Sequence, residues 1–179
     1  MNLRRWCRSL EPKAIALLHG PLGDKIRPWV DQHDVLSFSR TPLAKGLAFG
    51  LLCGLLPLGP IQMAATVLMC IKWRGNALVG VVTTLYSNAL TIVPLYLLAF
   101  QIGRWVIPGD YPIPDMSALT QAQGWFSGFW DWLMALGWPL LVGIPLLGTA
   151  LALLGYVLVQ GLWLLPVYRR AIRRNQINK

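Results

Sequence analysis

The residues of this chain best suited to bind a ligand or to join helices lie in one apolar stretch, TTLYSNALTIVP, at positions 83–94. Four hydroxyl or amide side chains recur there at intervals of three, one and three residues. On a continuous helix this spacing places all four on one face. A buried amide or hydroxyl without a partner is costly in hydrocarbon, so these groups must bond within the protein or contact a substrate. The four residues are Thr84, Ser87, Asn88 and Thr91.

Gln62 is the expected partner of Asn88 across the interior, because it closely follows a second interruption of the apolar sequence. Two interpretations stay open. In the first, the two amides join two broken helices and satisfy free backbone groups. In the second, all five polar residues line a substrate site near the bilayer midplane. No charged residue lies within 47–70 or 77–100, which disfavours proton coupling through a carboxylate.

Other kinds of chemistry find no support in the sequence. Cys7, Cys53 and Cys70 are odd in number and form no Cys-x-x-Cys pair, and His19 and His33 lack a second ligand nearby. No catalytic triad grouping, phosphate-binding glycine loop or His-Glu-x-x-His motif occurs. The sequence therefore predicts neither an enzyme nor a cofactor or metal site.

The composition indicates a membrane protein. Of 179 residues, 55% are hydrophobic and 13% charged, whereas a soluble domain carries about a quarter charged residues. No Lys or Arg occurs from Trp105 to Tyr168, and basic clusters bound the apolar runs, a pattern typical of integral membrane proteins. The net charge of +9 then favours anionic lipid headgroups as partners over nucleic acid, which requires base-stacking groups on a soluble scaffold.

The basic residues also predict the orientation, since cytoplasmic segments carry an excess of Lys and Arg. Both termini and the 72–74 turn are expected to be cytoplasmic, and the 108–131 loop periplasmic, in a multi-pass protein of the inner membrane. Residues 1–41 are expected to form a basic cytoplasmic segment. Two structures are possible for it: an interfacial helix or a partly disordered tail. Residues 169–179 form a basic cytoplasmic tail.

Residues 42–107 are predicted to form a membrane domain of two interrupted helical units. In the first unit, two arms of about 14 residues, or roughly 21 Å of helix, flank the sequence PLGP, and neither spans a hydrocarbon core of about 30 Å. This favours a re-entrant hairpin with Lys45 and the 72–74 turn on the same side. The helix-breaking residues are Pro57, Gly59 and Pro60.

Three glycines at four-residue spacing share one face of the first arm: Gly46, Gly50 and Gly54. Such a face lets another helix approach closely. Packing within the chain is the simpler interpretation, and a homodimer is the alternative.

The second unit, residues 76–106, would measure roughly 46 Å as one helix, which exceeds a single crossing. A break is therefore expected near Ser87–Pro94, where Pro94 removes a backbone donor and frees the carbonyl of Leu90. Shifting the first unit by 32 residues aligns its Lys-Trp pair with an Arg-Trp pair and superposes the two interruptions. Paired interruptions in corresponding halves are typical of transporter sites.

Residues 132–168 are expected to form a C-terminal transmembrane segment that ends near Pro166. The predicted fold class is thus an all-α integral membrane protein with two broken or re-entrant helical units plus one C-terminal transmembrane helix. Four tryptophans form either an aromatic belt at its outer entrance or the packing of a loop. They are Trp125, Trp130, Trp132 and Trp138.

Between Thr41 and Trp105 the chain shows a basic-Gly start, a glycine-spaced arm, a Pro-Gly turn followed by Gln, an Asn after the second arm, and Asn-x-x-Thr. This pattern resembles the bacterial membrane family catalogued as domain of unknown function 2062. Ala89 departs from it, since the family usually has Pro there, and Pro94 would take over that role. The resemblance implies a small inner-membrane protein and supplies no activity. The matching residues are Lys45, Gly46, Pro57, Gly59, Gln62, Asn76, Asn88 and Thr91.

The predicted function is a transporter or flippase-like protein for a small polar or lipid-headgroup substrate. The alternative is a non-transporting membrane accessory or scaffold protein.

Overall fold

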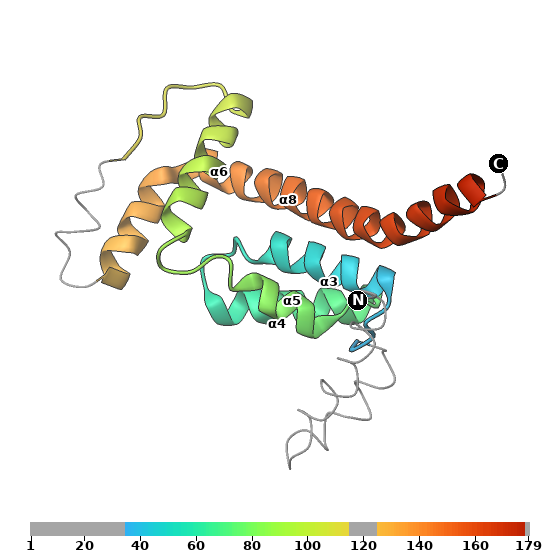
Figure 1. The fold of residues 1–179 in the computed structure, drawn as a ribbon. Coiled ribbons are helices and arrows are strands. Elements are labelled where there is room, and N and C mark those ends of the chain that lie inside the picture. Colours follow the sequence, from blue (N-terminus) through green and yellow to red (C-terminus); the bar gives the residue numbers. More distant parts are fainter. Residues whose placement is uncertain (1–34, 115–124, 178–179) are drawn as a thin grey trace, which may run out of the picture. The chain divides into compact units, whose positions relative to one another are not determined.

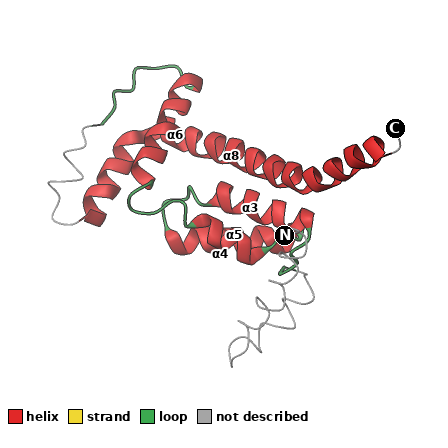
Figure 2. Cartoon of the chain, viewed as in Figure 1, coloured by secondary structure: helices red, strands yellow, loops and turns green. Residues whose placement is uncertain are grey.

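The computed structural model describes residues 35–114 and 125–177, and all the regular secondary structure in that part of the chain is helical (Figures 1 and 2). This confirms the all-α prediction. The interfacial helix considered for the N-terminal segment lies outside the described residues. The described helices are α3 (Arg40–Cys53), α4 (Gly59–Trp73), α5 (Ala77–Thr84), α6 (Ile92–Val106) and α8 (Trp125–Ile177).

The chain divides into two compact units. Unit 1 comprises Met1–Tyr86 and Ala150–Lys179, and unit 2 comprises Ser87–Thr149. Within unit 1, α3, α4 and α5 lie side by side (Figure 1). The part of α8 beyond Ala150 contacts α3. At this contact the backbone of Gly155 lies against the side chains of Leu47 and Leu51.

The first apolar block breaks between α3 and α4, at residues 54–58. The two helices have 14 and 15 residues, in agreement with the two short arms expected from the sequence. Gly59 and Pro60 belong to α4 itself, with the proline in the first turn. A proline is accepted there because the backbone N–H that it lacks has no partner within the helix.

The second block breaks between α5 and α6, at residues 85–91. Pro94 lies in the first turn of α6 rather than in the break, which corrects its predicted role as the breaking residue. Because the chain is not helical from Leu85 to Thr91, Thr84 and Asn88 do not share a continuous helix face as the spacing predicted.

Within unit 2, α6 and α8 cross where both helices carry small residues. A side chain at Gly103 of α6 would overlap the backbone of Pro139, and one at Gly143 of α8 would overlap the backbone of Ala99. Such direct backbone contact is the geometry that small residues four positions apart allow. The sequence analysis did not identify this crossing.

Helix α8 begins at Trp125 and extends to Ile177, so the expected 108–131 loop is helical over its last residues, and the helix continues into the predicted basic tail. The backbone at Gly137, with φ 58° and ψ −146°, kinks the helix. In the described part of the chain, Ser127–Leu164 is the one segment long and apolar enough to cross a membrane, judged by length and composition.

Candidate functional site

Gln62 closes the first helix break. Its side chain is buried in α4, and its amide lies 2.9 Å from the carbonyl oxygen of Gly54 and 3.2 Å from that of Leu56. Because both neighbours are acceptors, the amide nitrogen faces them and donates. The last carbonyls of a helix lack intrahelical partners, so Gln62 supplies donors where α3 ends.

Asn88 and Thr91 close the second break by bonding to each other's backbone. The Asn88 Oδ1 atom accepts from the N–H groups of Leu90 (3.0 Å) and Thr91 (3.1 Å), and the Thr91 Oγ1 atom accepts from the N–H of Asn88 (2.9 Å). This reciprocal arrangement resembles a capping box directly before α6. Asn88 is exposed and Thr91 half-buried.

Thr84 and Ser87 are both buried. The Thr84 hydroxyl donates to the carbonyl of Val81, 2.7 Å away, at the end of α5. Gln62 and Thr84 belong to unit 1, whereas Ser87, Asn88 and Thr91 belong to unit 2. The predicted pairing of Gln62 with Asn88 and the midplane site therefore stay predictions, and the hydrogen bonds described for these two amides are local to each break.

The glycine face of α3 is covered by the chain itself. A side chain at Gly46 would overlap the carbonyl of Asn76, and one at Gly50 would overlap Gly80 and Thr83 of α5. At Gly54 it would meet the ring of Tyr86, whose hydroxyl donates to the Leu51 carbonyl at 2.8 Å. The three glycines thus let α3 and α5 approach until backbone meets backbone.

Asn76 holds the turn between α4 and α5, a role that the sequence analysis did not assign. It is fully buried. Its Oδ1 atom accepts from the N–H of Val79 (2.9 Å) as the N-cap of α5, and its Nδ2 atom donates to the carbonyl of Ser37 (2.9 Å). Its own backbone N–H donates to the carbonyl of Pro42 (2.8 Å). The sequence does contain a signal for this role: an asparagine directly before an apolar helical segment is a candidate N-cap.

Basic residues gather at the same end of unit 1. The Lys45 ammonium donates to the carbonyl of Trp73, 2.8 Å away, at the C-terminus of α4. The Lys72 ammonium lies 4.8 Å from the centre of the Trp73 ring, and the Phe49 ring lies 5.6 Å away on α3. Lys45 and the 72–74 turn therefore lie together, as the hairpin prediction required.

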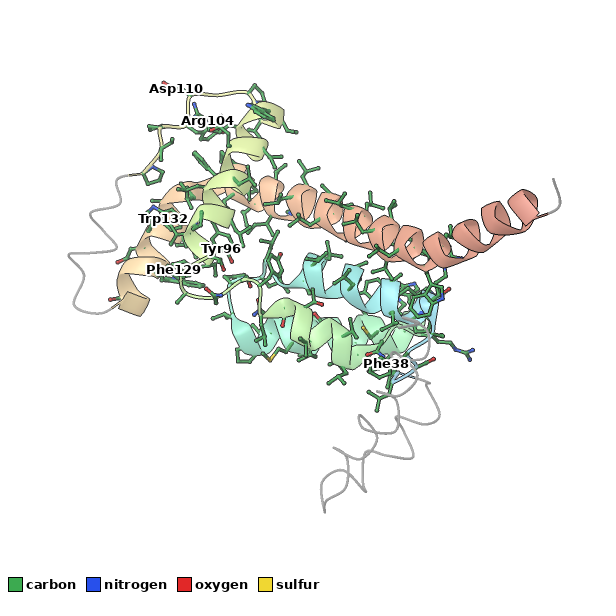
Figure 3. All side chains as sticks on the ribbon, in the orientation of Figure 1. Phe38, Tyr96, Arg104, Asp110, Phe129 and Trp132 are labelled. Atoms are coloured by element: carbon green, nitrogen blue, oxygen red, sulfur yellow. The ribbon has the colours of Figure 1, made fainter. Side chains whose placement is uncertain are left out.

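An aromatic cluster forms the core of unit 2, where Tyr96, Phe129 and Trp132 come together from α6 and α8 (Figure 3). The ring centroids of neighbours in this cluster are 6.1 and 6.2 Å apart. Trp132 is fully buried, and its Nε1 atom has no hydrogen-bond partner among the described residues. Trp132 is thus a core residue rather than part of an exposed aromatic belt.

The cysteines in the described residues are buried and free. Cys53 Sγ lies 3.4 Å from the sulfur of Met69, and Cys70 lies against Gly75 and Gly80. Across residues 35–114 and 125–177, no group of three or more His, Cys, Asp or Glu side chains is placed to hold a metal ion.

Comparison with known proteins identifies the family to which the chain belongs. No curated protein and no solved structure matches the chain. The model of a family described as an uncharacterized protein conserved in bacteria, DUF2062, matches residues 24–171. This match extends on both sides beyond the stretch between Thr41 and Trp105 that carries the resemblance in the sequence. The chain therefore belongs to the DUF2062 family.

Proposed function

We propose that the chain is a multi-pass protein of the bacterial inner membrane that moves a small polar or lipid-headgroup substrate at its broken helices. The observation that carries this proposal is the succession of short helices in the apolar blocks: α3, α4, α5 and α6 have 14, 15, 8 and 15 residues. A helix of 15 residues is roughly 22 Å long, less than a hydrocarbon core of about 30 Å.

The distribution of polar and apolar side chains supports the membrane part of this proposal. Several polar side chains are buried, whereas several large apolar side chains on α4, α5, α6 and α8 are more than half exposed. Buried polar groups and extended exposed apolar surface are the informative exceptions to soluble packing. The most apolar window of the α8 segment is only 22% buried, unlike a soluble core helix. Exposed examples are Leu68, Val82, Leu98, Trp138, Leu153 and Val157.

The paired breaks support the transport part. Each break separates two apolar helices and is closed by polar side chains: Gln62 in the first, Asn88 with Thr91 in the second. In membrane transporters, helices that stop within the bilayer expose backbone groups to which a substrate can bond. A polar substrate could exchange hydrogen bonds with these groups.

A non-transporting accessory or scaffold protein is the second candidate. The local hydrogen bonds of Gln62, Asn88 and Thr91 favour it, because each bond satisfies backbone groups of its own break. Side chains with a purely structural task would show this pattern.

The membrane proposal predicts that the full chain remains in the membrane fraction after an alkaline carbonate wash. A peripheral protein held by its basic residues is released by this treatment, since high pH deprotonates its lysines and weakens its attraction to the headgroups. The amount of chain in pellet and supernatant is measured by immunoblot, with a known peripheral protein of the same cells as control. Complete release would contradict insertion.

The transport proposal predicts that Asn88→Ala fails to restore the phenotype of a deletion strain, and that its effect on folding is too small to explain this failure. Asn88 is exposed, so losing its hydrogen bonds in the turn before α6 should cost only about 1 kcal/mol, and most of the variant should remain folded. Complementation and the melting temperature in detergent are measured for Asn88→Ala, Thr91→Ala and Gln62→Ala. If every loss of function follows a loss of folded protein, the scaffold interpretation is preferred.

A further inference from the structure

The turn from α4 to α5 presents two cations and an aromatic ring to the outside. Lys72, Trp73 and Arg74 are all exposed. Trp73 is 44% exposed, and its ring contacts both the Phe49 ring and the Lys72 ammonium. Lys45 is engaged with the Trp73 carbonyl at 2.8 Å, which leaves Lys72 and Arg74 as the outward-facing cations of this turn.

Arg74 occupies a backbone conformation that favours glycine. It is the C-cap of α4 in the left-handed region, with φ 52° and ψ 52°, and it is the one non-glycine residue with positive φ in the described part of the chain. An L-residue with a Cβ atom pays about 1–2 kcal/mol for this conformation, and helices most often place Gly there. Glycine would carry less strain at position 74, which makes the arginine side chain a candidate for a role other than folding.

The described residues of unit 1 offer these cations no anionic partner. Neither 35–86 nor 150–177 contains an Asp or Glu. Two exposed cations with no carboxylate among those residues provide a positive surface that can attract an anion. The half-exposed Trp73 ring suits a membrane–water interface, where tryptophan is enriched because its ring is amphipathic.

We propose that Lys72, Trp73 and Arg74 form a binding site for the phosphate headgroup of an anionic phospholipid. This inference rests on the membrane part of the proposed function. The guanidinium of Arg74 would form paired hydrogen bonds with two phosphate oxygens, Lys72 would add a point charge, and Trp73 would lie at the glycerol level. The turn is then fixed at the surface of an anionic leaflet.

The test measures lipid binding to the full chain in detergent micelles by native mass spectrometry. Phosphatidylglycerol and phosphatidylcholine with the same acyl chains are titrated in parallel. The wild type is expected to prefer phosphatidylglycerol. Arg74→Gly should weaken phosphatidylglycerol binding about five-fold, the contribution of one basic residue near an anionic surface, and leave phosphatidylcholine binding unchanged. Its melting temperature should equal or exceed that of the wild type, because glycine suits the left-handed conformation.

Two control variants make the result specific. Arg74→Lys keeps the charge and should keep most of the preference, whereas Arg104→Gln, at the end of α6, removes one charge elsewhere and should change nothing. The inference is overturned if Arg74→Gly keeps the preference or if Arg104→Gln reduces it equally. Displacement of the lipid by millimolar inorganic phosphate would also overturn it, since a free phosphate site would then suffice.

The outcomes separate this inference from the function on which it rests. A chain that resists the carbonate wash but shows no dependence on Arg74 refutes the headgroup site and leaves the membrane proposal intact. A chain released by carbonate refutes the membrane proposal, while the micelle titration still reports on Arg74.

Discussion

Replacing Gly50 with leucine is expected to leave little folded protein in the membrane. A Cβ atom at this position would overlap the carbonyl of Gly80 and lie 2.6 Å from the Cβ atom of Thr83. Backbone atoms cannot move aside as a flexible side chain can, so α3 and α5 must separate. We expect a loss of more than about 3 kcal/mol, at the upper end of overpacking effects. The measurement is the amount of protein in the membrane fraction and its melting temperature in detergent.

Gly161→Leu is the matched control for this prediction. Gly161 is exposed in α8, and no atom lies within 4 Å of a Cβ atom built there. Leucine also has a higher helix propensity than glycine, by somewhat less than about 1 kcal/mol. The control should therefore accumulate like the wild type. Equal accumulation of Gly50→Leu and Gly161→Leu would remove the argument for close backbone packing.

Asn76→Ala is expected to destabilise unit 1 by about 2–4 kcal/mol, because it leaves two partly buried partners unpaired, at about 1–2 kcal/mol each. The Ser37 carbonyl would lose its donor, and the Val79 N–H at the start of α5 would lose its acceptor. Asn76→Asp keeps the acceptor but places a carboxylate oxygen against the Ser37 carbonyl, so it should not restore stability.

The matched control for Asn76 is Asn88→Ala, which also removes an asparagine whose Oδ1 atom accepts from backbone N–H groups, here in the turn before α6. Asn88 is exposed, whereas Asn76 is fully buried, so water can replace the lost bonds of Asn88 and not those of Asn76. Melting temperatures in the same detergent compare the two variants. A loss for Asn76→Ala no larger than that for Asn88→Ala would show that burial does not determine the cost.

The helix breaks could be predicted where proline and glycine residues close in the sequence determine them. Pro57 lies in the observed break at residues 54–58, and Gly59 is the first residue of the helix that follows it. The second break was expected in the correct region, but Pro94 was assigned the wrong role because proline is equally compatible with a break and with a first helical turn. The reciprocal bonds of Asn88 and Thr91 place the break earlier.

Contacts between distant segments could not be predicted from the sequence. A glycine in an apolar run allows another segment to approach its backbone closely, but the sequence does not show which segment that is. The partner of Gly103 is Pro139, which lies far along the chain. The kink at Gly137 was missed for a related reason: nothing contacts a Cβ atom built there, and its positive φ is visible only in the folded backbone.

The burial of Asn76 depends on a segment outside the apolar blocks. Its donor bond goes to Ser37, which precedes α3, in a region that the sequence analysis assigned to a cytoplasmic segment. The asparagine was matched to a family pattern, but the pattern gave no partner. A side chain that joins two segments distant in sequence can be assigned its role only once the fold is known.

The crossing of α6 and α8 in unit 2 has a thermodynamic consequence. At Ala99 with Gly143, and at Gly103 with Pro139, the two backbones meet without intervening side chains. In a bilayer, separating them exposes both surfaces to lipid rather than to water, and the large heat-capacity increase of soluble unfolding comes from the hydration of apolar surface. The free energy of this contact should therefore vary nearly linearly with temperature. Cooling, which weakens a soluble hydrophobic core, would leave the crossing intact.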